Sequence, residues 1–376
     1  MKIKLLFGLT VFMLLLFGCQ EDKYNVNSLP KTTTNANISD TLYVQQGIPW
    51  GDSRYPLSGT FNSPQAVMVG NEPLVYVADT YNNRIVMLDI AGRVIGYSQR
   101  ILHPVALAQD KRLQLLVCAY FDTVLQGQTT TFGAVYRLNL PAVNHNIASA
   151  TPQRVIWDTT LGNYASRTYT AVATLYDNSY YVARVGNKNT GTFDPDNAII
   201  LFSKDDVFQS SVTFDFTQDG SGLLSMHYVT GLATMPTGTS NEYVFSQVQA
   251  SPAIALWKVQ WIKLVVQGQT HNWVSKFYPS VDGDIDLLRI NRFIQPRGVA
   301  LNQSGNLFVV DAGTDSVHCF NSRGIEQFSF GGHNDPYGRN FTQPYGVAYY
   351  DGDKTLFVAD KGNNRICRFK LSTDMN

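Results

Sequence analysis

Residues 341–371 read FTQPYGVAYYDGDKTLFVADKGNNRICRFKL and contain one complete structural unit of this chain. Three strand-like runs begin at Pro344, Leu356 and Arg365, and the segments between them are rich in glycine, aspartate and asparagine. Those residue types tolerate the backbone angles of tight reversals, and short apolar runs between them are typical of strands. The stretch therefore predicts a small antiparallel sheet.

The same pattern recurs with little change at residues 61–88 and 293–320. Residues 76–89 read YVADTYNNRIVMLD, and residues 356–369 read LFVADKGNNRICRF. These segments resemble NHL repeats, whose hallmark is an apolar strand ending in aspartate followed by an Asn-x-Arg-Ile strand. Because such a sheet cannot bury both faces alone, the resemblance implies radial stacking into a β-propeller.

Three weaker copies lie between the regular ones and begin near Val105, Thr170 and Thr230. The sequence thus predicts an all-β fold, a six-bladed β-propeller of four-stranded antiparallel blades. Each regular copy is followed by a fourth strand, except the last. We expect residues 41–47, TLYVQQG, to complete that last blade as its outer strand and so to close the ring.

The weaker copies are harder to divide into strands. In the third copy we expect the outer strand at residues 212–216, and in the fourth copy the third strand at residues 253–257. Loops of more than a dozen residues are usually functional or disordered. The sequence predicts long insertions in copies two to four, at residues 121–133, 141–153, 184–197, 205–227 and 260–292.

The first residues form a targeting segment. Lys2 and Lys4 precede an apolar run, and residues 16–19, LFGC, resemble the lipobox of bacterial lipoproteins. That resemblance implies a signal peptide at 1–18, a lipidated flexible tether at 19–40 attached through Cys19, and a propeller at 41–376. The implied location is extracytoplasmic, at the outer membrane or cell surface, with the membrane as a partner through the lipid on Cys19.

The charge balance and the spacing of possible metal ligands argue against several classes of binding partner. The 29 basic and 29 acidic residues cancel, so the clustered positive charge that nucleic acid binding needs is absent from the sequence. We expect no cofactor and no metal centre. Residues 282–286, DGDID, alternate like a calcium loop, but Leu287 and Phe293 stand where an EF-hand has glycine and glutamate. Calcium bound through other ligands and a solvated acidic turn both remain open.

The repeats carry aspartate and arginine at fixed positions. Asp79 and Asp360 precede Arg84 and Arg365 by five residues, while Asp311 keeps only the aspartate. An aspartate that accepts hydrogen bonds in the turn and pairs with an arginine is a structural device. We therefore assign these five residues to the repeat and expect no catalytic residue among them.

The residue that opens each innermost strand should face one mouth of the central channel. These positions differ from copy to copy, as expected for a ligand-binding funnel. An arginine in the third copy should project nearby. The candidate ligand-binding residues are Gln65, Thr170, Arg184, Thr230, Arg297 and Tyr345.

No contiguous nucleophile, phosphate-loop or dinucleotide motif occurs in the sequence. The leading hypothesis is a non-enzymatic propeller of the cell envelope that binds a glycan, a peptide or a partner protein at one face. One alternative is a hydrolase or lyase with its active site at the central channel. Another is a structural scaffold in an outer-membrane complex.

Overall fold

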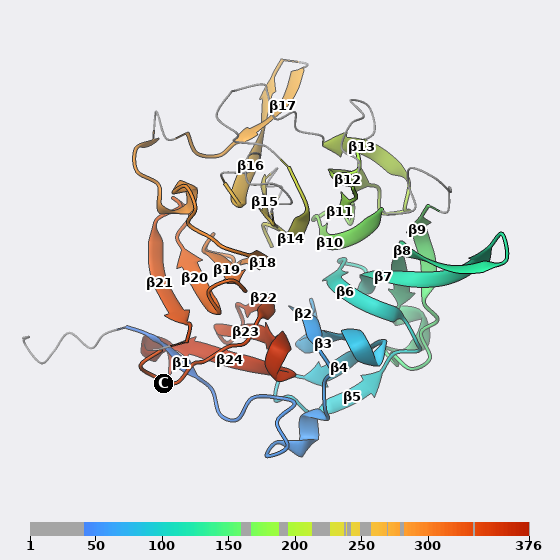
Figure 1. Cartoon of the computed structure of the whole chain (residues 1–376), viewed down its shortest axis with the longest axis horizontal. Helices are drawn as coiled ribbons and strands as arrows, with labels where there is room; N and C mark the ends of the chain where they lie inside the picture. The colour runs from blue at the N-terminus through green and yellow to red at the C-terminus, as the bar shows by residue number, and fades with distance from the viewer. Residues whose placement is uncertain are drawn as a thin grey trace, which may run out of the picture. The chain divides into compact units, whose positions relative to one another are not determined.

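Six antiparallel four-stranded sheets follow one another around a central axis, as predicted (Figure 1). The first blade consists of β2 (Pro64–Val69), β3 (Leu74–Asp79), β4 (Arg84–Asp89) and β5 (Val94–Tyr97). The second consists of β6 (Leu102–Gln109), β7 (Gln114–Leu125), β8 (Gln128–Asn139) and β9 (Gln153–Trp157). The third consists of β10 (Thr168–Thr174), β11 (Tyr180–Val185), β12 (Ala198–Phe202) and β13 (Phe208–Val212). The fourth blade consists of β14 (Val229–Thr234), β15 (Glu242–Gln247), β16 (Val259–Gln267) and β17 (Thr270–Ser275). The fifth consists of β18 (Pro296–Leu301), β19 (Leu307–Asp311), β20 (Ser316–Phe320) and β21 (Glu326–Gly331). The sixth consists of β22 (Pro344–Tyr350), β23 (Thr355–Asp360), β24 (Arg365–Leu371) and β1 (Tyr43–Gln45).

The structure is a computed structural model that describes residues 41–158, 167–187, 195–212, 226–236, 238, 242–248, 257–268, 270–278, 282–333 and 335–375. The helical elements in these ranges are short 3-10 turns: η3 (Pro56–Ser58), η4 (Thr80–Asn82), η5 (Pro141–Val143), η6 (Asp286–Leu288), η7 (Lys361–Asn363) and η8 (Ser372–Asp374). The predicted signal peptide, Cys19 and the tether lie outside the described residues.

The innermost strand of each blade contacts the innermost strand of the next, from β2 round to β22 and back to β2. At several of these contacts only glycine fits. A Cβ added to Gly298 would lie 2.5 Å from the carbonyl oxygen of Tyr345, and one added to Gly346 would lie 2.8 Å from Cα of Ala66. The small residue that marks each repeat in the sequence therefore allows the innermost strands to approach closely.

The ring is closed by the N-terminal strand, which also confirms the sequence prediction. β1 pairs with β24, with Tyr43 opposite Leu371 (Figure 1). Arg339 donates a hydrogen bond from Nη1 to the carbonyl oxygen of Tyr43 at 2.8 Å, and Asp335 holds the guanidinium through an ion pair of 2.8 Å. The Tyr43 ring also stacks on Phe330, with centroids 5.2 Å apart. The closing strand is thus fixed by backbone pairing, by a buried ion pair and by aromatic contact.

Apolar side chains fill each of the six interfaces between blades. Between the fifth and sixth blades, Phe308 and Val310 pack with Val358 and Phe369. Burial of a large apolar side chain contributes about 1.5–3 kcal/mol. Because each blade presents one face to either neighbour, the continuous apolar runs in the sequence correspond to strands covered on both sides.

Two strand assignments in the weaker copies were wrong. The outer strand of the third blade is β13, residues 208–212, instead of 212–216. The third strand of the fourth blade is β16, residues 259–267, instead of 253–257, so β16 and β17 occupy much of the predicted insertion at 260–292. A short apolar run does not by itself show which neighbouring segment forms the strand.

The predicted insertion at 121–133 is not a loop either. It extends β7 and β8 into a long hairpin in which Leu125 pairs with Gln128, and the hairpin projects from the second blade (Figure 1). Gln126 and Gly127 form the turn with φ values of 51° and 79°. The threonines at 129–131 are β-branched and favour a strand, which accounts for the extension.

The Asp335 carboxylate gives ring closure a defined pH dependence. Burial works to raise its pKa, but hydrogen bonds from Arg339 and from backbone N–H groups outweigh it and lower the pKa from 3.8 to about 2. The charged carboxylate therefore stabilises the fold above pH 3.8, and this contribution is lost as the pH falls toward 2. We expect Asp335→Asn to remove about 2 kcal/mol of unfolding free energy at neutral pH. Denaturant unfolding between pH 2 and pH 7 measures this, and a variant that kept the wild-type profile would contradict it.

Candidate functional site

The predicted channel residues lie at irregular points of the innermost strands. In every blade the pairing of the first two strands shifts register just before the small repeat residue, as between Pro64 and Ala66. A residue in such a bulge is released from regular pairing, and its side chain is turned away from the sheet faces. Five of the six candidates occupy these positions: Gln65, Thr170, Thr230, Arg297 and Tyr345. We call the channel end where the innermost strands begin the N-terminal mouth, and the other end the C-terminal mouth.

The N-terminal mouth brings four of the candidates to a common space. Gln65, Thr170 and Tyr345 line a cavity of about 230 Å³. Thr230 lines a narrower space of about 80 Å³ deeper in the channel, which Gln65 and Tyr345 also border. The guanidinium of Arg297 lies 5.2 Å from the centre of the Tyr345 ring. Residues from the first, third, fourth, fifth and sixth blades therefore meet at this mouth.

The two threonines also connect neighbouring blades. Thr170 donates its hydroxyl proton to the carbonyl oxygen of Val229 at 2.6 Å, and Thr230 donates to that of Pro296 at 2.8 Å. Their hydroxyl protons are thus already engaged, and only the oxygen lone pairs can accept a hydrogen bond from a ligand.

The structure does not bring Arg184 to the mouth. This residue lies on β11, is buried, and donates a hydrogen bond of 2.6 Å from Nη2 to the carbonyl oxygen of Pro195. It is not among the residues that line the three described cavities. The Arg184 guanidinium lies between two strands and is occupied by backbone carbonyl oxygens, which accounts for the difference between the predicted and the observed position.

The repeat aspartates are fully buried and hold the turns between strands. Asp79 accepts hydrogen bonds from the backbone of Asn62 at 2.7 Å and from Arg84 at 2.8 Å. Asp360 makes the equivalent contacts with Thr342 and Arg365, at 2.8 and 2.7 Å. Each carboxylate holds two chain segments together, so neither faces the channel with a free oxygen.

Asp311 has no arginine partner in its turn and uses backbone donors instead. Its two oxygens accept hydrogen bonds from the N–H groups of Ile294, Gln295 and Gly313 at 2.7, 2.7 and 2.9 Å. A carboxylate that accepts three N–H bonds is fully occupied by the fold.

Sequence reasoning missed two residues of the N-terminal mouth. His103 and Tyr120 line the 230 Å³ cavity, and their rings lie edge to face with centroids 6.4 Å apart. His103 has a φ of 44°, and Asn83 accepts a hydrogen bond from its backbone N–H at 2.9 Å. Burial, reinforced by the nearby phenol of Tyr345, raises the pKa of Tyr120, so its hydroxyl keeps its proton. The available signals were that His103 precedes the innermost-strand position of its copy by two residues and that Tyr120 directly follows the position of the repeat aspartate.

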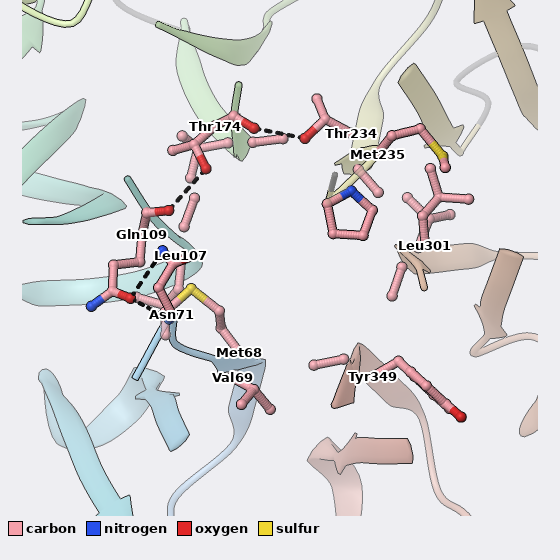
Figure 2. Close-up of a pocket in the computed structure, with 18 of the residues that line it drawn as sticks. Met68, Val69, Asn71, Leu107, Gln109, Thr174, Thr234, Met235, Leu301 and Tyr349 are labelled. Carbon is pink, nitrogen blue, oxygen red and sulfur yellow. Dashed lines mark hydrogen bonds between the residues drawn. The ribbon is translucent and has the colours of Figure 1, made fainter. Parts of the chain in front are cut away.

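A third cavity, of about 250 Å³, opens at the C-terminal mouth. On its polar side the hydrogen bonds run from blade to blade: Asn71 N–H donates to Gln109 Oε1 at 2.7 Å, and the hydroxyls of Thr174 and Thr234 donate to backbone carbonyls at 2.9 and 2.7 Å (Figure 2). Met68, Met235, Leu301 and Tyr349 supply side chains to the rest of the wall (Figure 2). These polar groups are therefore already engaged with one another across neighbouring blades.

The acidic segment at 282–286 does not converge on one point. Asp282 accepts a hydrogen bond from the backbone of Tyr278, and Asp284 and Asp286 pair with Arg289 at 3.1 and 2.9 Å. Within the described part of the chain, no three His, Cys, Asp or Glu side chains are grouped so that they could hold a metal ion.

The fifth blade contains a serine, a histidine and a glutamate connected as in a nucleophilic relay. Ser316 Oγ lies 3.0 Å from His318 Nε2, and His318 Nδ1 lies 2.8 Å from Glu326 Oε1. Burial works to raise the pKa of Glu326, but hydrogen bonds and charge from His318 and Arg292 outweigh it and lower the pKa. Ser316 and His318 are each only 7% exposed, and neither lines a described cavity. The arrangement is therefore a buried polar network of the fold.

Comparison with known proteins identifies the fold but no family. No protein-family model and no curated protein matches the chain. A gluconolactonase from Xanthomonas campestris is 12% identical, with a TM-score of 0.53 over 89% of this chain and 90% of its own. A luciferin-regenerating enzyme is 10% identical, with a TM-score of 0.53 over 88% of this chain and 95% of its own. An auxiliary nutrient binding protein from Bacteroides ovatus is 11% identical, with a TM-score of 0.55 over 88% of this chain and 77% of its own. Identities this low indicate a shared fold alone.

These neighbours correct the expectation of a non-enzymatic binding module. Two of the three are named for an enzymatic activity, and they agree better with the alternative of an active site at the central channel. The sequence argument treated the lack of a contiguous catalytic motif as a sign against catalysis. A propeller assembles its central site from single residues of different blades, so no contiguous motif is required.

No helix in the described part of the chain has the length and hydropathy to cross a membrane.

The relay in the fifth blade can be tested directly. We expect Ser316→Ala to lower the unfolding free energy by about 1–3 kcal/mol, because it leaves buried His318 Nε2 without its partner. We also expect a fluorophosphonate probe to leave Ser316 unlabelled in the wild-type protein, as followed by mass spectrometry. Labelling at Ser316 that disappears in His318→Asn would contradict the structural assignment.

Proposed function

We propose that this protein is a hydrolase or lyase that carries out acid–base chemistry at the N-terminal mouth of its channel. The observation that carries the proposal is the exposed imidazole of His103 in the wall of the 230 Å³ cavity, next to Tyr120. Histidine is the side chain most often used to transfer protons in catalysis. Among the described residues, neither ring nitrogen of His103 has a hydrogen-bond partner, so both are free to meet a substrate or a water molecule.

Hydrolysis of a lactone or a related ester is the reaction we favour, since a gluconolactonase shares the fold. In this mechanism His103 accepts a proton from water as the water oxygen attacks the ester carbonyl. Tyr120, kept protonated by burial, donates a hydrogen bond to the oxygen that becomes negative. The C–O bond to the leaving oxygen then breaks, and His103 returns the proton to that oxygen, which gives a hydroxy acid.

A lyase reaction uses the same groups differently. His103 would remove a proton next to a carboxylate, and Tyr120 would supply a proton to the departing group. Both reactions require a base and a neutral acid on the same side of a small cavity. The geometry of His103 and Tyr120 supports this pair of roles.

We also propose that the chain is an NHL-type propeller attached to the outer membrane or cell surface by lipid on Cys19. This proposal is supported by the basic start, the apolar run and the LFGC segment at residues 16–19. The polar segment at residues 23–40 is the proposed connection between the lipid and the propeller. The propeller would then act on small molecules outside the cytoplasm.

The catalytic role of His103 predicts the behaviour of one variant and its control. Asparagine tolerates positive φ, so His103→Asn should keep the backbone while removing the proton acceptor. We expect the rate of glucono-δ-lactone hydrolysis, or of another active lactone or ester, to fall by about 10²–10⁴. His145 also has positive φ, 59°, and does not line the described cavities, so His145→Asn is the matched control. A screen of lactones, esters and lyase substrates without turnover, or full activity of His103→Asn, would overturn the proposal.

Lipidation predicts a clear change in fractionation. Replacing Cys19 with serine should abolish labelling by an azido-palmitate analogue and move the protein from the membrane fraction to the aqueous fraction. Both are read on gels of labelled cells that carry the full-length gene. Continued labelling of the Cys19→Ser protein would contradict the proposed anchor.

A further inference from the structure

Two cations at the N-terminal mouth have no anionic partner in the described part of the chain. Several buried or half-buried arginines are paired with aspartate, as Arg84 is with Asp79 and Arg339 with Asp335. Arg297, in contrast, makes no ion pair there, and its buried Nε has no hydrogen-bond partner. The ammonium of Lys361 likewise has neither a carboxylate nor a carbonyl oxygen within hydrogen-bonding distance among these residues. A half-buried charge without a counter-ion has lost part of its hydration, and an anionic ligand would compensate that loss.

The two cations point at the same aromatic ring. Arg297 lies in the bulge of β18, and Lys361 begins the 3-10 turn η7 that follows β23. The Arg297 guanidinium carbon and the Lys361 nitrogen lie 5.2 and 5.0 Å from the centre of the Tyr345 ring. Tyr345 itself lines both the 230 Å³ cavity and the narrower channel below it. The positive charges are therefore held next to the proposed site by adjacent blades.

The positive charges of Arg297 and Lys361 repel each other. Burial and the positive charge of Arg297 both lower the pKa of Lys361. An anion bound between the two groups would remove that repulsion, and the cation–π contacts with Tyr345 compensate it only in part. Arg297 and Lys361 do not line the described cavities themselves, but both flank Tyr345, which does. Surplus positive charge beside a cavity is the electrostatic arrangement expected of an anion-binding site.

The size and lining of the cavity narrow the class of anion. Pockets for drug-sized ligands measure about 300–1,000 Å³, so a cavity of about 230 Å³ suits a smaller molecule. Gln65, Thr170 and the Tyr345 hydroxyl supply groups that can hydrogen-bond to hydroxyls. The planar guanidinium of an arginine matches a carboxylate, with which it forms paired hydrogen bonds.

We propose that Arg297 and Lys361 bind the carboxylate of a small hydroxy acid at the N-terminal mouth. The inference rests on the proposed function, because such an acid is the product of lactone hydrolysis at this site. The carboxylate lies between the two cations, and the hydroxyls of the acid face Gln65 and Thr170. The same cations attract the negative charge that develops on the carbonyl oxygen during ring opening.

The first test uses the wild-type protein and one neutral analogue. Sodium gluconate is added to the full-length protein during acetylation by an amine-reactive ester, and modification of Lys361 is followed by mass spectrometry. We expect gluconate to slow acetylation of Lys361, while glucose, which lacks the carboxylate, leaves it unchanged. Equal acetylation rates with and without gluconate would overturn the inference.

The second test compares variants by titration calorimetry. We expect Arg297→Gln and Lys361→Met each to weaken gluconate binding at least tenfold. Lys370→Met is the matched control, because Lys370 is also half-buried but is paired with Asp353 at 3.5 Å on the outer part of the last blade. Inorganic phosphate is titrated in parallel, and tighter binding of phosphate than of gluconate would overturn the assignment to a carboxylate.

The outcomes separate this inference from the proposed function. If gluconate binds, is lost in both variants and is kept in Lys370→Met, the inference stands even when no reaction is found. If lactone hydrolysis is found but gluconate binds the two variants as it binds the wild-type protein, the inference fails and the catalytic proposal survives.

Discussion

The close approach of the innermost strands is the constraint on which the rest of this propeller depends. A Cβ on Gly231 would lie 2.4 Å from the carbonyl oxygen of Arg297, so the backbones of the fourth and fifth blades touch at that point. Such contacts leave no room for side chains between the innermost strands. The residue just before each contact is displaced into a bulge and directed to the N-terminal mouth. The close approach of the innermost strands therefore also determines which residues face the channel.

The charged groups that stabilise the blades and the charged groups beside the channel lie in different parts of the ring. The aspartates of the regular repeats are buried in the turns, where arginine or backbone N–H groups occupy their oxygens. Arg297 and Lys361 are not neutralised in this way among the described residues. The carboxylates thus stabilise the blades, and the surplus positive charge remains at the mouth. A protein with no net charge can still present a strongly positive site, because its neutralising groups lie elsewhere.

The regular repeats made most of the fold predictable. Alternating turns and apolar runs of fixed length identified six blades, and the missing fourth strand after Leu371 identified β1 as the closing strand. Strand positions in the third and fourth blades could not be predicted as well, because insertions there remove the fixed spacing between turns. The β7–β8 hairpin was mistaken for a loop since its strand character comes from pairing between its own two arms.

The candidate site was predictable only where its residues stand at the start of the innermost strands. Gln65, Thr170 and Tyr345 occupy equivalent positions in their copies, so one alignment located all three. His103 precedes the aligned position of its copy by two residues, and Tyr120 and Lys361 each follow the aspartate position of theirs, so their proximity to the channel depends on how turns of separate blades converge in space.

The difference between the predictable and the unpredictable residues follows from how the blades are arranged around the ring. The fifth, sixth and first blades keep the repeat and hold Arg297 and Tyr345 in fixed positions. The second blade keeps the same spacing at its first strand, where residues 102–106, LHPVA, stand at the positions of residues 62–66, NSPQA, of the first blade. His103, Ser63 and Gln343 each precede the proline of the innermost strand, and all three have a positive φ, of 44°, 55° and 47°. The repeat therefore supplies this position in several blades, and what distinguishes the second blade is the titratable imidazole that stands there and lines the cavity.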